Sequence, residues 1–584
     1  MAPTLQGIVS DITFRSDDTG FTVLRLTRDG QSPAACIGIM PTLEPGISVS
    51  LTGKWEAHPR FGNQFSVTSY EILRPRTREA VVALLGSGLL PHLGGAKAAR
   101  IVDRFGEETM DILDNHPQRL LEVPGIGRKT LAKIKDAWDR RKSLTELLLF
   151  LQEFGVTVSL AIKIHQAYGA RAKEIISQNP YALMEDVWGI GFKRADAIAQ
   201  KLGFVHDSYR RIRAGIIHAL QEALGSGHTY LPRDTVEAMS SELLGVPPEK
   251  VLFSLDSLLQ ASGVIDESNR IYLPHVHEAE KTVGQMIRMR VAAQASVGRA
   301  DRTLVGNWLK SYSIAHGWQG DPKQIDAVLT ALTSSIFLLT GGPGTGKTTT
   351  LQVIVSYFRQ HSIPVVLAAP TGRAAQRMGS ISGLTAQTIH RLLEFKPGKD
   401  GFRFLKNADN QLDTAVVILD EVSMVDIFLM RSLLVALRPD TTLILVGDAN
   451  QLPSVGPGNV LADLIASKKI PSVNLTAIFR QSVQSDIIGC AHDIINNRVP
   501  QFSNDRDSDC FFITEEDPEQ CAARIVDLVA GRLPKKYGFD PVSDIQVLSP
   551  MHKGALGTQN LNRLLQKVLN SSGTSLTRGE VVFR

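Results

Sequence analysis

The feature that most constrains this sequence is the stretch "SSIFLLTGGPGTGKTTTLQ", which begins at Ser334. An apolar run ends in a glycine-rich turn that fits the pattern G-x-x-x-x-G-K-[ST] from Gly341 to Thr348, and helix-forming residues follow. Strand, glycine turn and helix in this order are what a phosphate-binding loop requires, because glycines let backbone N–H groups approach a phosphate closely. A plain glycine-rich turn is the alternative, and the flanking pattern makes it the weaker one. The sequence therefore predicts a nucleotide site.

The side chains of this loop have separate expected roles. The Lys347 ammonium group neutralises β- and γ-phosphate oxygens, and the Thr348 hydroxyl group is a ligand for Mg²⁺. A nucleotide with Mg²⁺ is therefore the expected ligand, although the loop alone does not distinguish a kinase, a GTPase and a motor. The residues of the loop expected to bind nucleotide are Gly341, Gly342, Pro343, Gly344, Thr345, Gly346, Lys347, Thr348 and Thr349.

A pair of acids follows a second apolar run, in "AVVILDEVSMV". A buried parallel strand would place Asp420 and Glu421 at its C-terminal edge, beside the glycine loop. We expect Asp420 to bind Mg²⁺ through water and Glu421 to polarise the attacking water as general base. Acids after a strand are also common as plain helix caps, and the preceding glycine loop favours the catalytic interpretation.

A third apolar run, in "TTLILVGDANQLPSVGPG", is followed by Gln451. A neutral amide at this place can hydrogen-bond a γ-phosphate oxygen and lose that bond on hydrolysis. Gln451 is therefore a candidate sensor of the nucleotide state. The alternative is an ordinary turn stabilised by Asp448 and two prolines.

The pattern of apolar and polar residues changes along the rest of the chain. Its 584 residues are enough for several domains. Residues 5–75 contain short strand-like runs with turns between them, and residues 79–290 are mainly helical in pattern. From about residue 300, apolar runs alternate with amphipathic helices, as in a parallel sheet covered on both faces. We therefore expect an α/β multidomain fold, in which a parallel-sheet unit follows a small β-barrel and helical domains.

Composition limits the functional classes. The chain is 43% hydrophobic and 21% charged, with a net charge of +4, which permits nucleic acid as a partner without requiring it. No apolar run approaches a membrane span, so a soluble, cytoplasmic protein without a membrane partner is expected. The four cysteines include no C-x-x-C pair, so neither a zinc site nor a disulfide framework is predicted.

Two glycine turns in the helical part predict contact with DNA. The segment "EVPGIGRKTLAKI" places a tight turn before a helix that begins near Arg128, and "DVWGIGFKRADAI" repeats the pattern. Such a helix-hairpin-helix lets main-chain amides approach a backbone phosphate without reading bases. Residues 119–142 hold eight basic and three acidic side chains, although each turn alone could be a plain helical hairpin. The residues expected to contact DNA here are Gly125, Gly127, Lys129, Gly189 and Gly191.

The motifs together resemble a known family. In order, "GGPGTGKTTT", "AAPTGRAAQRM", "TIHRLL", "ILDEVSMVD", "GDANQLPSVGPG", "AIFRQ" and "LSPMHKGALGTQNLN" resemble the RecD-like helicases of superfamily one. The front half, with "DDTGFTVLRL", "FGNQF" and the two glycine turns, resembles the long-form bacterial members, of RecD/TraA type, which carry an N-terminal extension. The resemblance implies an ATP-dependent DNA helicase that moves 5′ to 3′ on single-stranded DNA in recombination and repair. Two RecA-like domains would hold ATP between them.

The resemblance also implies roles for residues that match the family's motifs. Gln324 corresponds to an adenine-reading glutamine, with an ordinary exposed helix residue as the alternative. Arg480 corresponds to an arginine that reaches the γ-phosphate from the second domain, with a structural arginine as the alternative. A hairpin at about 394–413 takes the place of a strand-separating pin. The residues matching the family's DNA-contacting motifs are Pro370, Thr371, Arg373, Thr388 and His390, the last with a capping or core role as its alternative.

The expected domains follow from these matches. They are an OB-like β-barrel over 1–78, a helix-hairpin-helix region over 79–205, a winged-helix-like region over 206–295, a first RecA-like ATPase domain over 296–470 and an incomplete second one over 471–584. Single-stranded and forked DNA are the expected partners of a monomer, with single-stranded-DNA-binding protein or other repair proteins as protein partners. The barrel aromatics Phe14, Phe21, Trp55 and Phe61 are interpreted equally as core residues or as stacking surfaces for bases.

One departure from the family is the end of the sequence at "TRGEVVFR", where the family continues through two further motifs. We therefore expect weak ATP hydrolysis from this chain and no processive unwinding. A DNA-binding scaffold with a vestigial ATPase is the main rival interpretation. A P-loop kinase would need an acceptor pocket in place of Gln451 and Arg480, and a topoisomerase or nuclease would need a tyrosine nucleophile or a clustered acidic metal site.

Overall fold

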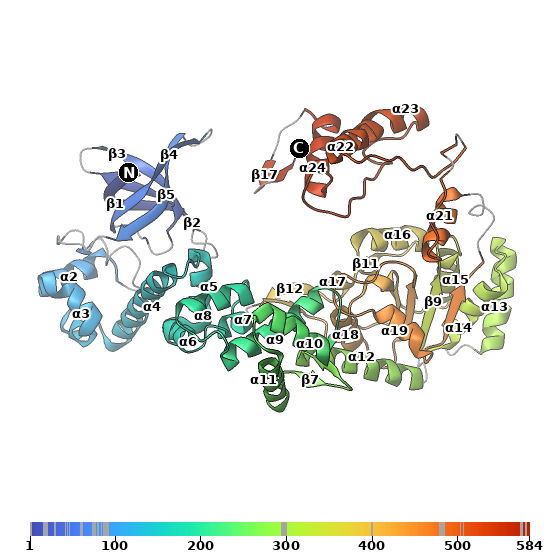
Figure 1. Cartoon of the computed structure of the whole chain (residues 1–584), viewed down its shortest axis with the longest axis horizontal. Coiled ribbons are helices and arrows are strands. Elements are labelled where there is room, and N and C mark those ends of the chain that lie inside the picture. Colours follow the sequence, from blue (N-terminus) through green and yellow to red (C-terminus); the bar gives the residue numbers. More distant parts are fainter. Residues whose placement is uncertain are drawn as a thin grey trace.

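The computed structural model confirms the α/β multidomain fold. It describes residues 3–15, 21–28, 31–40, 43, 45, 47–58, 62–72, 78, 81–82, 85, 93–293, 301–398, 401–477, 485–502, 504–505, 507–572, 576–578 and 581–583. Figure 1 shows the N-terminal barrel and the first helices at one side, the parallel sheet at the other, and the last helices above that sheet. No helix in these described ranges is long and apolar enough to cross a membrane.

The N-terminal strands close into a barrel in the order β1-β2-β3-β5-β4. Alternate side chains of these strands point inward, and Leu24, Leu51 and Phe65 are buried at its centre. Phe14 and Trp55 lie on the surface instead of in the core, as does Phe21, while Phe61 lies outside the described residues. The strands are β1 (Thr4–Arg15), β2 (Phe21–Arg28), β3 (Gln31–Ile39), β4 (Ser48–His58) and β5 (Gly62–Ile72).

A series of helical hairpins follows the barrel. Ile126 and Ile190 each lie buried in the turn before a helix, and the helix after the first turn begins at Arg128, as expected. The elements are α2 (Gly95–Phe105), η1 (Gly106–Glu108), α3 (Thr109–Asn115), η2 (Pro117–Glu122), α4 (Arg128–Gln152), α5 (Val158–Tyr168), η3 (Gly169–Arg171), α6 (Ala172–Gln178), α7 (Ala182–Asp186) and α8 (Phe192–Lys201).

The next helices pack on a small antiparallel sheet of order β6-β8-β7, an arrangement typical of a winged helix. A buried ion pair joins this part to α8, since the Arg211 guanidinium group donates to both oxygens of Asp196 at 2.8 and 3.1 Å. The elements are α9 (Tyr209–Gly225), β6 (Tyr230–Pro232), α10 (Arg233–Leu244), α11 (Pro248–Gln260), β7 (Ile265–Asp266), β8 (Arg270–Tyr272) and α12 (Pro274–Ala292).

The parallel sheet has the order β11-β10-β14-β15-β9-β16. Every residue of β9, β14 and β15 is buried, as their continuous apolar runs predict for strands covered on both faces. One face packs on α14 and α15, and the other on α12, α18 and α19. The strands are β9 (Ile336–Gly341), β10 (Val365–Ala369), β11 (Ala386–Thr388), β14 (Val416–Leu419), β15 (Thr442–Gly447) and β16 (Ser472–Leu475). The helices are α13 (Arg302–His316), α14 (Pro322–Thr333), α15 (Lys347–Gln360), α16 (Gly372–Ser382), α17 (Ile389–Leu392), η4 (Val422–Met424), α18 (Ile427–Ala436) and α19 (Val460–Ser467).

The position of β16 corrects one expected boundary. The sequence placed the start of a second domain near residue 471, but β16 pairs in parallel with β9, and its Leu475 lies opposite Gly341. The strand therefore completes the first sheet at its edge. Exposed and buried residues alternate along β16, which is typical of an edge strand. This pattern does not predict which sheet the strand joins.

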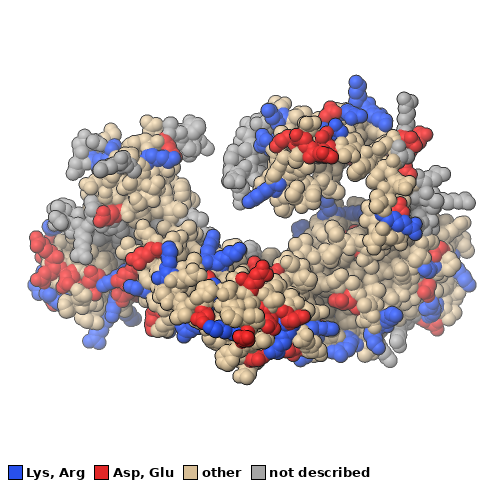
Figure 2. Space-filling model, viewed as in Figure 1, with Lys and Arg blue, Asp and Glu red and all other residues tan. Residues whose placement is uncertain are grey.

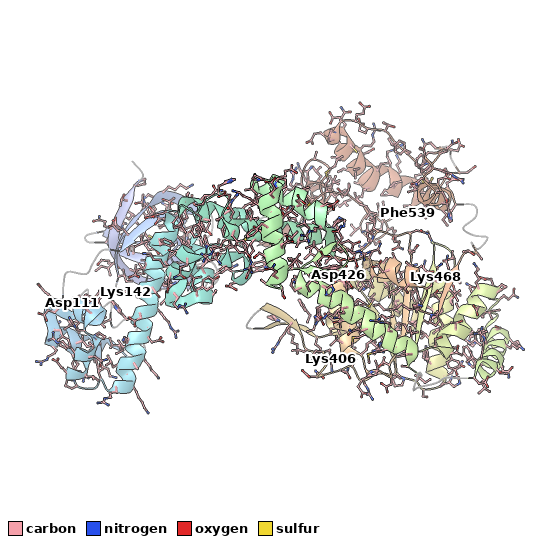
Figure 3. All side chains as sticks on the ribbon, turned by 60° about the horizontal axis from the view of Figure 1, so that its bottom comes forward. Asp111, Lys142, Lys406, Asp426, Lys468 and Phe539 are labelled. Carbon is pink, nitrogen blue, oxygen red and sulfur yellow. The ribbon has the colours of Figure 1, made fainter. Side chains whose placement is uncertain are left out.

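A two-stranded hairpin leaves the parallel-sheet region between β11 and β14. It comprises β12 (Phe395–Gly398) and β13 (Gly401–Phe404), and is shorter than the expected 394–413. The Phe395 and Phe404 rings pack together with their centroids 5.1 Å apart, and His390 contacts both rings. Figure 3 shows this ribbon projecting from the sheet region near Lys406.

The C-terminal part, expected to be an incomplete second RecA-like domain, consists mainly of helices and irregular segments among its described residues. Among its described residues from 485 onward, the only strand pairing is the antiparallel pair β17 (Leu576–Arg578) and β18 (Val581–Phe583). Residues 545–548 lie in no strand. The other elements are α21 (Asp486–Ile495), α22 (Pro518–Asp527), η5 (Leu528–Arg532), α23 (Leu533–Tyr537) and α24 (Thr558–Leu569).

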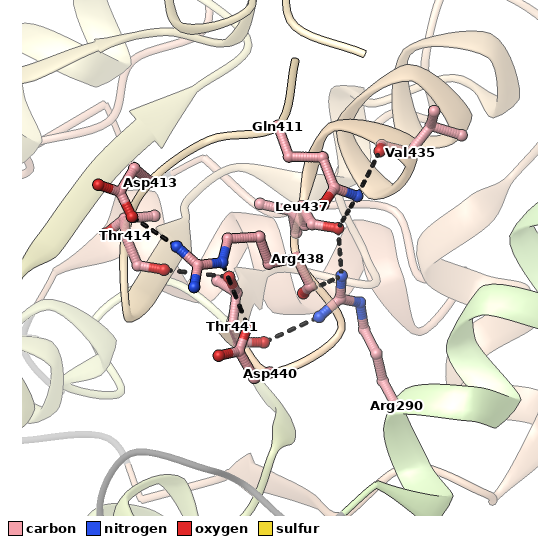
Figure 4. A network of polar contacts seen from close by, with 9 residues as sticks. All are labelled: Arg290, Gln411, Asp413, Thr414, Val435, Leu437, Arg438, Asp440 and Thr441. Atoms are coloured by element: carbon pink, nitrogen blue, oxygen red, sulfur yellow. Dashed lines mark hydrogen bonds and ion pairs between the residues drawn. The ribbon is translucent and has the colours of Figure 1, made fainter. Parts of the chain in front are cut away.

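A buried arginine ties α12 to the parallel-sheet region (Figure 4). The Arg290 side chain is 3% exposed, and its guanidinium group donates to the carbonyls of Thr441 (2.8 Å), Arg438 (3.0 Å) and Leu437 (3.3 Å). Its own carbonyl accepts a hydrogen bond from the Ser335 hydroxyl group at 2.6 Å, just before β9. Burial lowers the pKa of Arg290 to about 10, which leaves it charged at neutral pH. The helical part is therefore fixed to the loops that lead into β9 and β15.

Replacing Arg290 with methionine is expected to loosen this joint. The change leaves three buried carbonyls without their charged donor, which costs about 3 kcal/mol, or about 10²-fold in local opening. Hydrogen exchange of the α12 and α18 backbone amides, followed by mass spectrometry, measures that opening. Arg288→Met, an exposed arginine on the same helix, is the control. Equal exchange in the two variants would show that the guanidinium group contributes no net stability.

Candidate active site

The glycine loop joins β9 to α15 as the sequence predicts. Gly344 and Gly346 have φ values of 72° and 82°, a left-handed conformation that costs glycine little. At Gly341 a Cβ atom would lie 2.7 Å from Thr345 Oγ1 and 2.8 Å from the Leu475 carbonyl oxygen, so only glycine fits beside β16. The loop therefore leads the chain sharply from the end of a buried strand into the N-terminus of a helix, where free N–H groups favour an anion.

Lys347 lies over this loop. Its ammonium group donates to the carbonyls of Gly341 and Gly342, the second at 2.9 Å, and lies 3.8 Å from Asp448 Oδ2. Asp448 is 3% exposed, and its other oxygen accepts a hydrogen bond from the Asn450 N–H at 3.0 Å. From sequence Asp448 is expected only to stabilise a turn, but its side chain also orients the lysine. Its place after a third buried strand, matching that of Asp420 after the second, is the signal that could have indicated this.

Hydrogen bonds from two threonine hydroxyl groups stabilise the loop. The Thr345 hydroxyl group donates to the Gly342 carbonyl at 2.8 Å, and the Thr350 hydroxyl group donates to the Gly346 carbonyl at 3.0 Å. Gln324 also reaches the loop, since its amide nitrogen lies 3.5 Å from the Gly346 carbonyl and its oxygen accepts the Asp321 N–H at 3.2 Å. Gln324 is 1% exposed, which contradicts its alternative as an ordinary exposed helix residue.

The acidic pair lies where the sequence places it, at the end of β14. Asp420 Oδ1 accepts the Glu421 N–H at 2.9 Å, and Glu421 has a φ of 54°, an uncommon conformation for a residue other than glycine. Burial raises the pKa of both carboxyl groups, and Asp420 raises that of Glu421 further. The positive charges of Lys347 and Arg377 oppose this shift in both groups. The lysine and the two acids therefore act on one another electrostatically.

The residues expected to hold Mg²⁺ share one small cavity. Thr348 and Asp420 both line it, on α15 and after β14 respectively. Mg²⁺ is bound in such proteins by one or two protein oxygens together with phosphate oxygens and waters, so a hydroxyl group and a carboxylate fit its chemistry. No cluster of three or more His, Cys, Asp or Glu side chains suited to a metal occurs among the described residues. Arg377 lines the same cavity and was missed by the sequence analysis.

The two remaining residues expected to contact the nucleotide are Gln451 and Arg480. Gln451 is exposed on the loop after β15, where its N–H donates to the Asp448 carbonyl at 3.2 Å. Its side chain therefore belongs to the same edge of the sheet as Lys347. Arg480 lies outside the described residues.

The expected DNA-contacting residues of the sheet region gather at neighbouring strand ends. Ala369 of β10 pairs with Thr388 of β11, so residues 370–373 and 388–390 leave the sheet side by side. The Thr371 and Thr388 hydroxyl groups cap α16 and α17, accepting backbone N–H groups at 3.3 and 3.2 Å. Pro370 is half-buried, and Arg373 hydrogen-bonds Gln546 of the C-terminal part. His390 is exposed and contacts the aromatic rings of the hairpin, so it is neither a cap nor a core residue.

The two glycine turns of the helical part have matching geometry. Gly125 and Gly189 have φ values of 93° and 99°, and Gly127 and Gly191 stand just before α4 and α8. Neither helix start has a side-chain cap, so its first N–H groups are available to an external acceptor. Lys129 is exposed beside the first turn. In Figure 1 these turns lie away from the parallel sheet, which makes them a separate surface.

Four family models match the chain in its order of domains. The model of the ATP-dependent DNA helicase YrrC OB-fold domain matches residues 2–75, and that of the SAM-like helix-hairpin-helix tandem matches 87–140. The ATP-dependent RecD2 DNA helicase HHH domain matches 140–230, and an AAA domain matches 324–457.

Full-length similarity decides the family. The ATP-dependent RecD2 DNA helicase of Deinococcus radiodurans is 33% identical over 601 residues, which cover 99% of this chain and 80% of that protein. The chain belongs to the RecD2 helicase family. The RecBCD enzyme subunit RecD of Mycobacterium tuberculosis is 39% identical over 186 residues, covering 28% of this chain and 32% of that protein. The RecD2 match spans barrel, helical part and parallel sheet together, whereas the RecD match covers little more than a quarter of the chain.

Among solved structures, the Pif1 helicase from Candida albicans is 22% identical over 36% of this chain and 55% of that one. Its TM-score of 0.27 is too low for any comparison of the arrangement of elements. The RecD2 assignment therefore depends on sequence.

Proposed function

We propose that this RecD2-family chain is an ATP-dependent DNA helicase that couples hydrolysis of ATP to movement along single-stranded DNA. One observation carries the proposal: Lys347, Asp420, Glu421 and Asp448 gather at one edge of the sheet. The chain segments after β10 and β11, which match the family's DNA-contacting motifs, leave the same sheet at neighbouring strands. A nucleotide site and a DNA site on one rigid sheet can sense each other's occupancy.

The nucleotide chemistry follows from the side chains. Lys347 and the α15 N-terminus bind the β- and γ-phosphates, and Thr348 and Asp420 hold Mg²⁺, which when bound supplies positive charge to the phosphate oxygens. Glu421 accepts a proton from the attacking water, helped by the burial that raises its pKa. Gln324 lies where it can read the adenine, Gln451 reports the γ-phosphate, and Arg480 adds positive charge from the C-terminal part.

The DNA contacts are proposed at three places. Pro370, Thr371, Arg373, Thr388 and His390 face the single strand, and the hairpin β12–β13 separates the strands at the fork. Gly125, Gly127, Lys129, Gly189 and Gly191 hold duplex phosphates through main-chain N–H groups and one ammonium group. Figure 2 shows a hollow between the barrel and the C-terminal helices, and the surface below it carries both Lys and Arg and Asp and Glu side chains. The Lys and Arg side chains there would attract phosphates.

The finer properties of this activity are proposed from the family alone. We assign a 5′ to 3′ direction, a monomeric state, a role in recombination and repair, and repair proteins such as single-stranded-DNA-binding protein as partners. The domain limits are those given by sequence, with the first RecA-like domain extended through β16. ATP and DNA are both available in the cytoplasm, and we place the activity there.

Unwinding of forked DNA tests the function. We expect the chain to separate a short fork, which requires no processive unwinding, at least about tenfold faster when the fork carries a 5′ single-stranded tail than when it carries a 3′ tail. A directional motor gains productive access to the fork from one tail only, and a tenfold preference corresponds to about 1.4 kcal/mol in the barrier. Strand separation with ATP and Mg²⁺, followed by gel electrophoresis of labelled strands, measures both rates.

A hairpin replacement provides the control for this assay. With residues 396–403 replaced by a short glycine linker, ATP hydrolysis stimulated by single-stranded DNA should persist while strand separation is lost. Tight DNA binding without ATP hydrolysis or unwinding would instead favour the scaffold with a vestigial ATPase. Transfer of the phosphoryl group to a small acceptor, without free phosphate, would identify a kinase.

A further inference from the structure

Helix α16 lies between two cavities, and Arg377 lines both of them. The inner cavity lies against Thr348 and Asp420, the two residues expected to hold Mg²⁺. The outer cavity lies between α16 and residues 542–546 of the C-terminal part, and has a volume of about 620 Å³. Ile381 is the other residue that both cavities share, so both spaces lie against the same turn of α16.

We propose that these cavities form the exit path of inorganic phosphate, with Arg377 as an anion site half-way along it. The inference rests on the proposed function, because ATP hydrolysis supplies this ligand. In that reaction the water oxygen bonds to the γ-phosphorus atom, the bond from that phosphorus to the β-phosphate bridging oxygen breaks, and the water proton passes to Glu421. ADP and free phosphate result, and the phosphate starts beside Thr348 and Asp420.

The positive charges along α16 suit a phosphate dianion. Arg373 and Arg377 are one helical turn apart and both line the outer cavity. A guanidinium group can bind two phosphate oxygens at once. In the lining of the inner cavity Asp420 carries the negative charge and Arg377 the positive one, and the outer cavity adds Arg373 together with Asp544. A dianion released next to Asp420 is therefore repelled from the acid and attracted toward Arg377.

The inner end of this path is closed in the structure. The inner cavity has a volume of about 20 Å³, which holds a single water but no phosphate. The Gln352 amide group of α15 donates to the Ile381 carbonyl of α16 at 3.0 Å and ties the two helices across the opening. At the outer end, Arg373 hydrogen-bonds Gln546. A small separation of α15 from α16 would open the path, so the Gln352 hydrogen bond is its inner gate.

Comparing hydrolysis with phosphate release tests the path. Rapid chemical quenching gives the rate of the chemical step in a full chain loaded with ATP, and a fluorescent phosphate sensor gives the release rate. Arg377→Met is expected to slow release about tenfold, the loss of one charge-assisted contact, and to affect the chemical step less than threefold. Gln352→Ala should speed release. Arg359→Met, an exposed arginine on α15 outside both cavities, is the control and should change neither rate.

Two outcomes would overturn the path. Equal slowing of hydrolysis and release in Arg377→Met would show that the arginine acts on the acidic pair in the chemical step. Release unchanged in both Arg377→Met and Gln352→Ala would show that phosphate leaves elsewhere.

Binding of inorganic phosphate separates this inference from the proposed function. In a Lys347→Met chain the glycine loop loses its ammonium group, and phosphate titrated by calorimetry should still bind at Arg377. Adding Arg377→Met should weaken that binding about tenfold, whether or not the chain hydrolyses ATP. A chain that does not hydrolyse ATP refutes the proposed function. Phosphate affinity that is independent of Arg377 refutes the anion site.

Discussion

Replacing Lys347 with methionine is expected to lower kcat/KM for ATP by about 10³-fold, or about 4 kcal/mol. The ammonium group is half-buried and is held by two loop carbonyls and by Asp448, so it already points along the loop before a phosphate arrives. Methionine keeps much of the apolar stem and removes only the charge. Steady-state phosphate production with single-stranded DNA present measures the effect.

A matched variant and a binding measurement complete this test. Lys310→Met removes an exposed lysine from α13 of the same region and should leave the rate unchanged. Affinity for a fluorescent ATP analogue should fall in Lys347→Met while affinity for single-stranded DNA is retained. A Lys347→Met chain that hydrolyses ATP within tenfold of the unmodified chain would remove the glycine loop from the mechanism.

The sheet and its nucleotide edge could be predicted because each signal is local. The runs that became β9, β14 and β15 are apolar at every position, which a strand covered on both faces requires. The glycines of the loop are needed by the backbone itself, as Gly341 shows where it packs against Leu475. Loop and acids then meet because parallel strands end at the same edge of a sheet.

Other parts of the fold and of the site depend on contacts that a sequence pattern does not encode. β3 contains a proline and small residues, and is a strand because β2 and β5 pair with it. β16 joins the first sheet through pairing with β9, across more than 100 residues of intervening chain. Arg377 is one more basic residue on an amphipathic helix until the fold places it against Asp420.

Gln324 is another residue whose role the sequence alone does not decide. The sequence leaves Gln324 open between an exposed helix residue and a nucleotide contact, and only its burial against the Gly346 carbonyl decides against the first. Its capping contact with Asp321 was also readable as a local signal, since an acid followed three residues later by glutamine starts α14. The Gln324 side chain therefore both caps α14 and contacts the glycine loop.

Replacing Glu421 with glutamine is expected to lower the rate of ATP hydrolysis by about 10²- to 10³-fold and to leave ATP binding nearly unchanged. Glutamine has the same shape and tolerates the same backbone, but it cannot accept a proton from water. Burial and Asp420 raise the pKa of Glu421, which makes its carboxylate a stronger base than an exposed one. Rapid quenching of a single turnover measures the chemical step, and a fluorescent ATP analogue measures binding.

The chain contains a close control for this substitution. Glu394 is also a glutamate in the left-handed conformation, with a φ of 53° against 54° for Glu421, but it is exposed at the base of the hairpin. Glu394→Gln therefore repeats the chemical and backbone change outside the site, and should leave the single-turnover rate unaltered. Asp420→Asn should instead weaken the Mg²⁺ dependence of binding, since that side chain is proposed to hold the metal. If Glu421→Gln hydrolyses ATP as fast as Glu394→Gln, another group activates the water, and Asp448, buried beside Lys347, is the first to replace.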